Sequence, residues 1–263
     1  MDLGLLNKNV VITGGSKGLG RAVAEVFAHE KANVMINSRS QEHLDQAAND
    51  IYKNSGQRIH THKGNVSDHD YPSKLFDQIK KTFGSLDILI SNAGGPKPGK
   101  FESFSDQDWY DAIDLSMMSH IRLIRECLPL LRQSKTPSVL TITSFSAKQP
   151  IPNLILSNVL RAAAVGLTKT LSLELGSENI RFNSILPGWT KTERVTALLK
   201  NRAETNKTSI TEEMEKITAE IPLARMAEPH EFANVAVFLT SPAASYLTGI
   251  MLTVDGGVVK STF

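Results

Sequence analysis

Short apolar runs and longer amphipathic stretches alternate along the chain. Residues 19–30 and 165–176 carry apolar residues at helical spacing, and residues 154–167 read as the start of an apolar helix with two polar residues, Ser157 and Arg161, at helical spacing. Alternating strands and helices form right-handed βαβ units, so the expected fold is α/β, a doubly wound parallel sheet with helices on both faces. Six runs rich in β-branched and apolar residues predict its buried strands: "NVVIT" (9–13), "NVMIN" (33–37), "LDILI" (86–90), "SVLTIT" (138–143), "IRFNSI" (180–185) and "MLTV" (251–254).

The length and composition of the chain fit one domain. A chain of 263 residues with 41% hydrophobic and 21% charged residues is long enough to bury a large core, and no linker or repeat divides it. We therefore expect a single domain over residues 1–263. Residues 193–220 are more polar and charged than the segments around them and predict one or two surface helices inserted into this domain.

Charge, cysteine content and the N-terminus narrow the partners and the compartment. The net charge of +2 argues against nucleic acid or an anionic membrane as a partner. The single cysteine, Cys127, cannot form an internal disulfide, which fits a reducing compartment. No apolar run reaches 18 residues, and the N-terminus lacks the basic and apolar regions of a secretory signal. A cytoplasmic protein is the simplest expectation.

The stretch "TGGSKGLG" (13–20) lies between a predicted strand and a predicted helix. Glycines in this position allow a tight turn and a close approach of the backbone to a pyrophosphate, which the N-terminus of the following helix stabilises. A glycine-rich stretch can also be a plain turn. The spacing T-G-x-x-x-G-x-G, together with the later motifs, favours a nucleotide site.

Four motifs in order resemble the short-chain dehydrogenase/reductase family, from about residue 5 to residue 257. They are the glycine loop, "SNAG" (91–94), "PGWTKT" (187–192) and "VDGG" (254–257). The segment "IPLARMAEPHEFA" (221–233) is similar to 3-oxoacyl-carrier-protein reductases in particular. The resemblance implies a Rossmann-like fold, a nicotinamide dinucleotide as cofactor, a small carbonyl or alcohol substrate, and a homotetramer.

The resemblance also implies which residues hold the cofactor. The glycine loop would bind the phosphates, the pair at 65–66 would bracket the adenine, the turn at 92–94 would lie beside the ribose, and residues 187–192 would hold the nicotinamide. Asn65 departs from the Asp that the family more often has, but an amide can also donate to and accept from adenine. The predicted cofactor residues are Gly14, Ser16, Lys17, Gly18, Leu19, Gly20, Arg39, Asn65, Val66, Asn92, Ala93, Gly94, Arg161, Pro187, Gly188, Trp189, Thr190 and Thr192.

The end of the second predicted strand indicates which dinucleotide binds. An acidic residue there accepts from the ribose 2′-hydroxyl of NAD, whereas a 2′-phosphate calls for arginine. The strand runs into "NSRS" with Arg39 and no acid, and Lys17 lies inside the glycine loop. Each could be a solvated surface charge, but together they predict NADP(H).

The catalytic positions depart from the family pattern. In the family, a serine and a Tyr-x-x-x-Lys pair supply the reaction, and a helix asparagine completes a proton relay. Ser144 matches the serine, but Ser157 stands in place of the tyrosine and Arg161 in place of the lysine. Asp114 is aligned with the asparagine. Three of the four positions are therefore altered.

Residue chemistry limits what this set can do. Residues four apart share one helix face, so Arg161 can still reach the ribose and bring positive charge to the site. Arginine stays protonated and cannot relay a proton, and Ser157 lacks the reach and acidity of a phenol. An alternative is that Ser157 is merely tolerated and that Arg161 ties down a buried carbonyl.

A substitute proton donor is Lys148, on the loop after Ser144, or a water held between Ser144 and Ser157. Lys148 would need an enclosed site that lowers its pKa, whereas most loop lysines are simply solvated. The cluster of His60, His62 and His69 with two aspartates has no zinc-type spacing, and we predict no metal site. His60 and His62 alternate along a further predicted strand.

Two functions remain open from the sequence. The first is an NADP(H)-dependent oxidoreductase of the short-chain dehydrogenase/reductase type, a carbonyl reductase or alcohol dehydrogenase with an atypical proton donor. The second is a catalytically degraded protein that uses the dinucleotide as a structural or sensing ligand. Loss of the tyrosine and lysine favours the second, and retention of Ser144 and "PGWTKT" favours the first.

Overall fold

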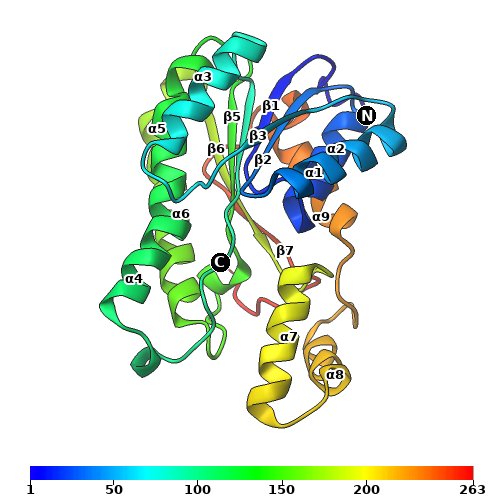
Figure 1. The fold of residues 1–263 in the computed structure, drawn as a ribbon, viewed down its shortest axis with the longest axis vertical. Coiled ribbons are helices and arrows are strands. Elements are labelled where there is room, and N and C mark those ends of the chain that lie inside the picture. The colour runs from blue at the N-terminus through cyan, green and yellow to red at the C-terminus, as the bar shows by residue number, and fades with distance from the viewer. Residues whose placement is uncertain (263) are drawn as a thin grey trace.

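The computed structural model describes residues 1–262 and contains one seven-stranded sheet in the order β3-β2-β1-β4-β5-β6-β7 (Figure 1). Every neighbouring pair is parallel. This confirms the expected α/β fold with a parallel sheet. The strands are β1 Asn9–Ile12, β2 Asn33–Ser38, β3 His60–Lys63, β4 Ile88–Ser91, β5 Ser138–Ile142, β6 Arg181–Pro187 and β7 Met251–Val254.

Helices cover both faces of this sheet, as predicted (Figure 1). One face carries α1, α2 and α9, and the other carries α3, α5 and α6. The helices are α1 Gly18–His29, α2 Gln41–Ser55, α3 Tyr71–Phe83, α4 Asp106–Ile113, α5 Ser119–Leu131, α6 Ile155–Glu174, α7 Glu193–Asn206, α8 Ile210–Glu220 and α9 Pro229–Thr240. A π-helical turn, Asp114–Met118, joins α4 to α5.

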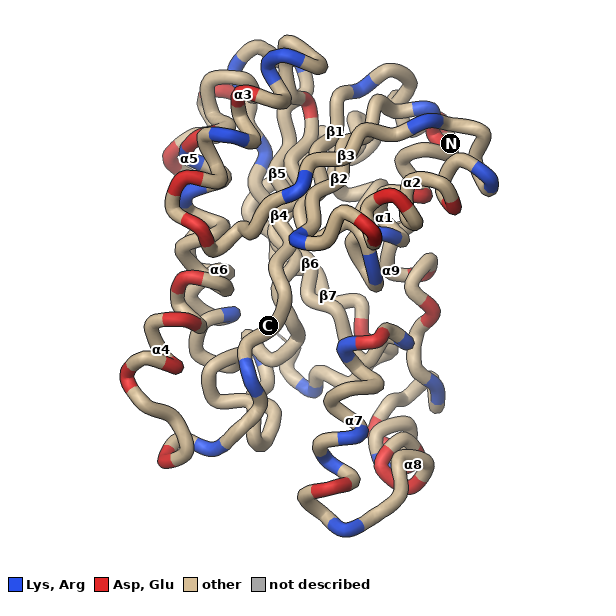
Figure 2. Tube along the Cα trace, in the orientation of Figure 1, with Lys and Arg blue, Asp and Glu red and all other residues tan. Residues whose placement is uncertain are grey.

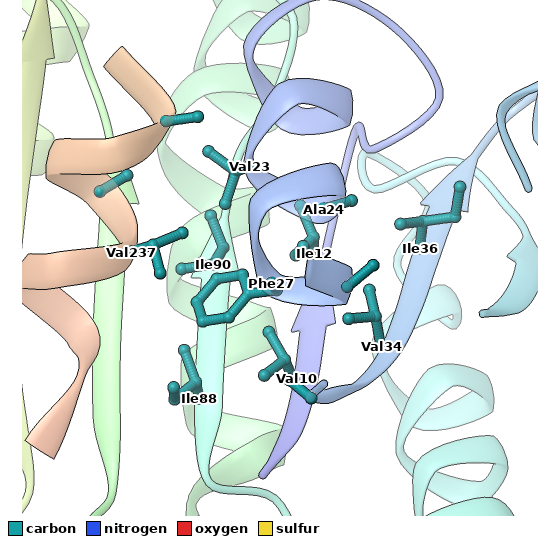
Figure 3. Packing of buried hydrophobic residues seen from close by; sticks show 14 of the residues in the cluster. Val10, Ile12, Val23, Ala24, Phe27, Val34, Ile36, Ile88, Ile90 and Val237 are labelled. Carbon is teal, nitrogen blue, oxygen red and sulfur yellow. The ribbon is translucent and has the colours of Figure 1, made fainter. Parts of the chain in front are cut away.

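The strand residues alternate between two hydrophobic cores, because successive side chains point to opposite faces of a sheet. Val10 and Ile12 pack with Phe27 of α1 and Val237 of α9, as Figure 3 shows. Val11, between them, belongs to the core on the other face. The sheet is thus buried on both sides, which is why the central strands β1, β4 and β5 are mainly apolar.

Residues 193–220 form two helices, α7 and α8, that extend from the lower end of the sheet (Figure 1). Glu213 of α8 is fully buried and accepts hydrogen bonds from Lys216, Asn206, Thr208 and Arg202. These contacts, the one from Lys216 first, lower the pKa of the Glu213 carboxyl to about 2. Glu213 therefore stays ionised and fastens α8 to the end of α7.

Charges of both signs are spread along the chain, including α7 and α8 (Figure 2). Within residues 1–262, no helix is long and apolar enough to cross a membrane.

Candidate active site

A cavity of about 800 Å³ opens at the carboxyl ends of the strands. Ligands bind at this edge in parallel α/β sheets, and the volume suits a dinucleotide with a small substrate. Its walls come from the loops after β1, β2, β3, β4, β5 and β6 and from the first two turns of α6 and α7. All the predicted cofactor residues line it except Gly20, which lies one residue beyond Leu19 in the buried first turn of α1.

The glycine loop is built to bring backbone close to a ligand. Gly14 has φ of +59°, a left-handed conformation that favours glycine, and its carbonyl accepts a hydrogen bond from Asn92 Nδ2 at 3.3 Å. Thr13 Oγ1 donates to the Asn92 carbonyl at 2.7 Å, which joins this loop to the turn after β4. Lys17 precedes α1 without capping it through its side chain, so the N–H groups of the first turn face the cavity, as an anion site requires.

The end of β2 presents cations and hydroxyls to the same cavity. Arg39 and Lys17 both line it, and Ser16 Oγ lies 2.8 Å from Ser38 Oγ between them. Glu193, at the start of α7, is the one carboxylate among the lining residues that the structure describes. This end therefore has the charge that a 2′-phosphate needs.

Ser144, Ser157 and Arg161 meet at the other end of the cavity. Ser144 follows β5 in an extended conformation, and its Oγ accepts from the Ser146 backbone N–H at 3.1 Å. Ser157 is half-buried in the first turn of α6. α6 begins at Ile155, as the predicted helix start in residues 154–167 requires, and so places Arg161 one turn beyond Ser157.

Arg161 is almost fully buried, and its guanidinium binds backbone carbonyls. Nη1 donates to the Ile142 carbonyl at 3.3 Å, and Nη2 donates to the Gly94 carbonyl at 3.2 Å and the Ala93 carbonyl at 3.5 Å. Burial first, and then the charge of Arg194, lower the pKa of Arg161 to about 10. The group therefore remains a cation at neutral pH.

Two of the predicted catalytic residues lie outside the lining of this cavity. Asp114 starts the π-helical turn, and its Oδ1 accepts from Arg122 Nη2 at 2.7 Å. Lys148 is exposed at the end of a short 3₁₀ turn, Phe145–Ala147. The enclosed setting that a catalytic Lys148 would need is therefore not found at its position.

Buried polar residues near Arg161 escaped the sequence analysis. His120 of α5 is fully buried, and its Nδ1 lies 2.7 Å from Ser91 Oγ. Within the described chain, its Nε2 and the Oγ of Ser116, one turn earlier, have no hydrogen-bond partner. Burial, with Arg161 adding, lowers the pKa of His120 to about 3, so the ring is neutral. The i, i+4 spacing of Ser116 and His120 in an apolar helix was the available signal.

The fold and this site together define a class of protein. A parallel sheet carries at its carboxyl edge a nucleotide-sized cavity, with phosphate-binding backbone at one end and hydroxyls beside a guanidinium at the other. These are the features of a dinucleotide-dependent oxidoreductase.

The chain belongs to the short-chain dehydrogenase/reductase family. The family model that matches it is described as Enoyl-(Acyl carrier protein) reductase and covers residues 14–259. This confirms the family predicted from the four motifs.

Individual relatives match over almost the whole chain. NADPH-dependent reductase BacG of Bacillus subtilis is 29% identical, over 97% of this chain and 98% of its own length. The 3-oxoacyl-[acyl-carrier-protein] reductase FabG of Chlamydia muridarum is 30% identical over 97% and 98%. The structure of L-sorbose reductase from Gluconobacter frateurii, complexed with NADPH and L-sorbose, has a TM-score of 0.94 at 32% identity and covers 99% of this chain and 100% of its own. These relatives confirm the predicted class, an oxidoreductase, and support NADP(H) as the predicted cofactor.

Proposed function

We propose that the chain is an NADPH-dependent reductase of small carbonyl compounds that also oxidises the corresponding alcohols. The observation that carries this proposal is the meeting of Ser144, Ser157 and Arg161 at one end of the cavity whose other end has the glycine loop and Arg39. A protein that only senses the dinucleotide has no need of hydroxyls and a buried cation at the nicotinamide end. NADPH, when bound, supplies the hydride.

The residues of this chain have separate tasks in the proposed reaction. Ser144 holds the substrate oxygen, and the charge of Arg161 stabilises the negative charge that develops on it. Arg161 also anchors the ribose of the cofactor. Because neither residue can act as a phenol does, the proton comes from a water held between Ser144 and Ser157. Loss of a dedicated acid lowers the rate by ~10²–10⁴-fold, so we expect a slow enzyme.

Single-turnover oxidation of NADPH against a panel of ketones tests this function. We expect turnover by the wild-type protein, weaker NADPH binding in Arg161→Ala, and unchanged binding with a slower rate in Ser157→Ala. Lys148→Ala is the matched control and should behave as wild type. If the wild-type protein binds NADPH without turnover, while Ser157→Tyr with Arg161→Lys reduces ketones, the chain is a binding protein instead.

We also infer a homo-oligomer, a tetramer by the family resemblance, that works in the cytoplasm. The outward face of α6 supports the oligomer, because its exposed residues are apolar or small apart from Lys169 and Glu174. The lone buried Cys127 fits a reducing compartment. Recovery of the native protein in a membrane or secreted fraction would contradict the cytoplasmic location.

A further inference from the structure

Two guanidinium groups face the catalytic end of the cavity without an acidic partner. Arg161 contacts backbone carbonyls, and Arg194 Nη2 donates to the Pro96 carbonyl at 2.7 Å. Of the ion pairs that the structure describes among residues 1–262, none includes either arginine. Arg194 is close enough to Arg161 for its charge to lower the pKa of Arg161. Arg161 is buried whereas Arg194 is exposed, so water solvates Arg194 in the free protein, and an anion that enters the cavity would meet two cations without a counter-charge of their own.

The position of Arg194 is built into the loop after β4. Its guanidinium lies on Gly95, where a Cβ atom would be 2.8 Å from Nη2 and 3.1 Å from Cζ. Any other residue at position 95 would therefore push the guanidinium away. Glycine at this site keeps the charge of Arg194 over the mouth of the cavity.

The phosphate end of the cavity has donors of its own. Lys17, Arg39 and the first turn of α1 surround the loop after β1. Arg194, by contrast, rests on the loop that follows Gly94, beside Arg161. An anion that binds Arg194 would therefore belong to the substrate and not to the phosphates of the cofactor.

The walls next to Arg194 are apolar. Val195 and Leu198 of α7 line the cavity together with Ile151, Leu154 and Trp189. A second cavity of about 190 Å³ adjoins it, shares Ile151, Leu154, Trp189 and Leu198, and is also lined by polar residues, among them Asn201 and Arg202. A ligand that lies against the shared wall has an apolar body.

We propose that Arg194, with the charge of Arg161 behind it, binds a carboxylate of the substrate, so that the preferred substrates are oxo acids with an apolar body. This inference rests on the proposed reductase function. A planar guanidinium can bind a carboxylate through two parallel hydrogen bonds, which fixes the substrate's orientation as well as its charge.

Calorimetry tests the site without turnover. Phenylacetate and its neutral amide, phenylacetamide, are titrated into the protein saturated with NADPH. We expect the acid to bind at least tenfold more tightly than the amide in wild-type protein and in Lys191→Gln. Lys191 is the matched control, because it is a nearby cation that pairs with Glu228 outside the cavity lining. Arg194→Gln should abolish the difference and change the NADPH Kd by less than threefold, and Gly95→Ala, which keeps the charge, should reduce it.

Kinetics then separate this inference from the proposed function. Benzoylformate and its methyl ester form a reducible pair, and we expect kcat/KM to favour the acid at least tenfold in wild-type protein but not in Arg194→Gln. Equal affinity for acid and amide, including no measurable binding of either, would overturn the inference. So would a tenfold loss of NADPH affinity in Arg194→Gln with the acid preference intact, because Arg194 would then serve the cofactor. A retained acid preference without reduction of any ketone would instead overturn the proposed function.

Discussion

The side chain of Arg161 can supply positive charge to the site but cannot transfer a proton. Its planar group reaches the carbonyls of Ile142, Ala93 and Gly94 at once, across the ends of β4 and β5. A lysine ammonium is a point charge and could not span the three in the same way. Arg161 therefore supplies a fixed positive charge, and the transfer of the proton has to be performed by another group.

A second single residue, Arg39, is predicted to set the preference for NADPH over NADH. We expect the protein to bind NADPH at least tenfold more tightly than NADH, a difference of about 1.4 kcal/mol, because Arg39 and Lys17 can pair with the 2′-phosphate. Arg39→Asp should narrow or invert this preference, because a carboxylate repels the phosphate and accepts from a 2′-hydroxyl. Calorimetric titration of both cofactors measures it. Equal affinities in the wild-type protein would show that the two cations serve another purpose.

The positions of single residues in the cavity could be predicted where a sequence motif fixes them. They could be predicted less well where the helix geometry is irregular. Ser144, Ser157 and Arg161 were predicted from the family resemblance, and the structure places all three in the lining of one cavity. Asp114 lies in a π-helical turn, whose wider spacing the usual period of 3.6 residues does not describe. Its partner Arg122 follows two turns later, which makes an ion pair at the helix surface rather than a cavity contact.

At the scale of elements, α7 and α8 form one unit that shares a small hydrophobic core with the loops after β5 and β6. Leu199 and Ile217 pack in a cluster with Trp189 and Phe145 near the cavity. Glu213 of α8 forms ion pairs with Arg202 of α7 and with Lys216 of α8. A unit that is internally fastened but joined to the sheet through few elements can move as a whole.

We predict that residues 193–220 are a lid that orders over bound ligands. Amide hydrogen exchange in this segment should be faster than in the sheet and should slow when NADPH and substrate bind. Glu213→Gln should speed exchange in the free protein, because it removes the charge that four partners share, while the exposed variant Glu215→Gln serves as control. Unchanged protection on ligand binding would mean a fixed surface or subunit-contact unit.

The strands could be predicted from the sequence where they are apolar. They could be predicted less well at the edge of the sheet, where a strand can be polar. β3 is the polar run "HTHK", which pairs with β2 alone and is largely accessible. Its alternating histidines were its only signal, since an edge strand need not be apolar. α6 begins at Ile155, within the stretch 154–167 that reads as the start of an apolar helix, and Ser157 and Arg161 are the polar residues of this stretch that line the cavity.

For the whole molecule, we expect the tetramer that the family resemblance implies, and we predict that the outward face of α6 forms one of its subunit contacts. Apart from the exposed charges Lys169 and Glu174, its exposed residues are apolar or small and follow one helical stripe, Val159, Ala162, Ala163, Gly166, Thr170 and Leu173. Light scattering should give four times the 28.8 kDa mass of the chain. Ala163→Glu should lower this mass, because a charge in a tightly packed apolar contact is costly, while Lys169→Glu at the edge of the stripe should not. A wild-type mass equal to one chain would exclude the tetramer.

The π-helical turn between α4 and α5 limits how this protein can change in length. Such a turn is an α-helix with one residue added, so α4 and α5 are offset by about 100° around the helix axis. Loss of a single residue there would rotate one helix against the other and carry Ser116 away from the side of α6. The short loop between α7 and α8 fixes no helix rotation of this kind, although Thr208 donates to Glu213 and Ser209 caps α8, and a longer loop costs little additional entropy. Proteins that diverge from this chain should therefore accumulate insertions and deletions near residues 207–209. The segment at residues 114–118 should keep its length even where all of its residues have been substituted.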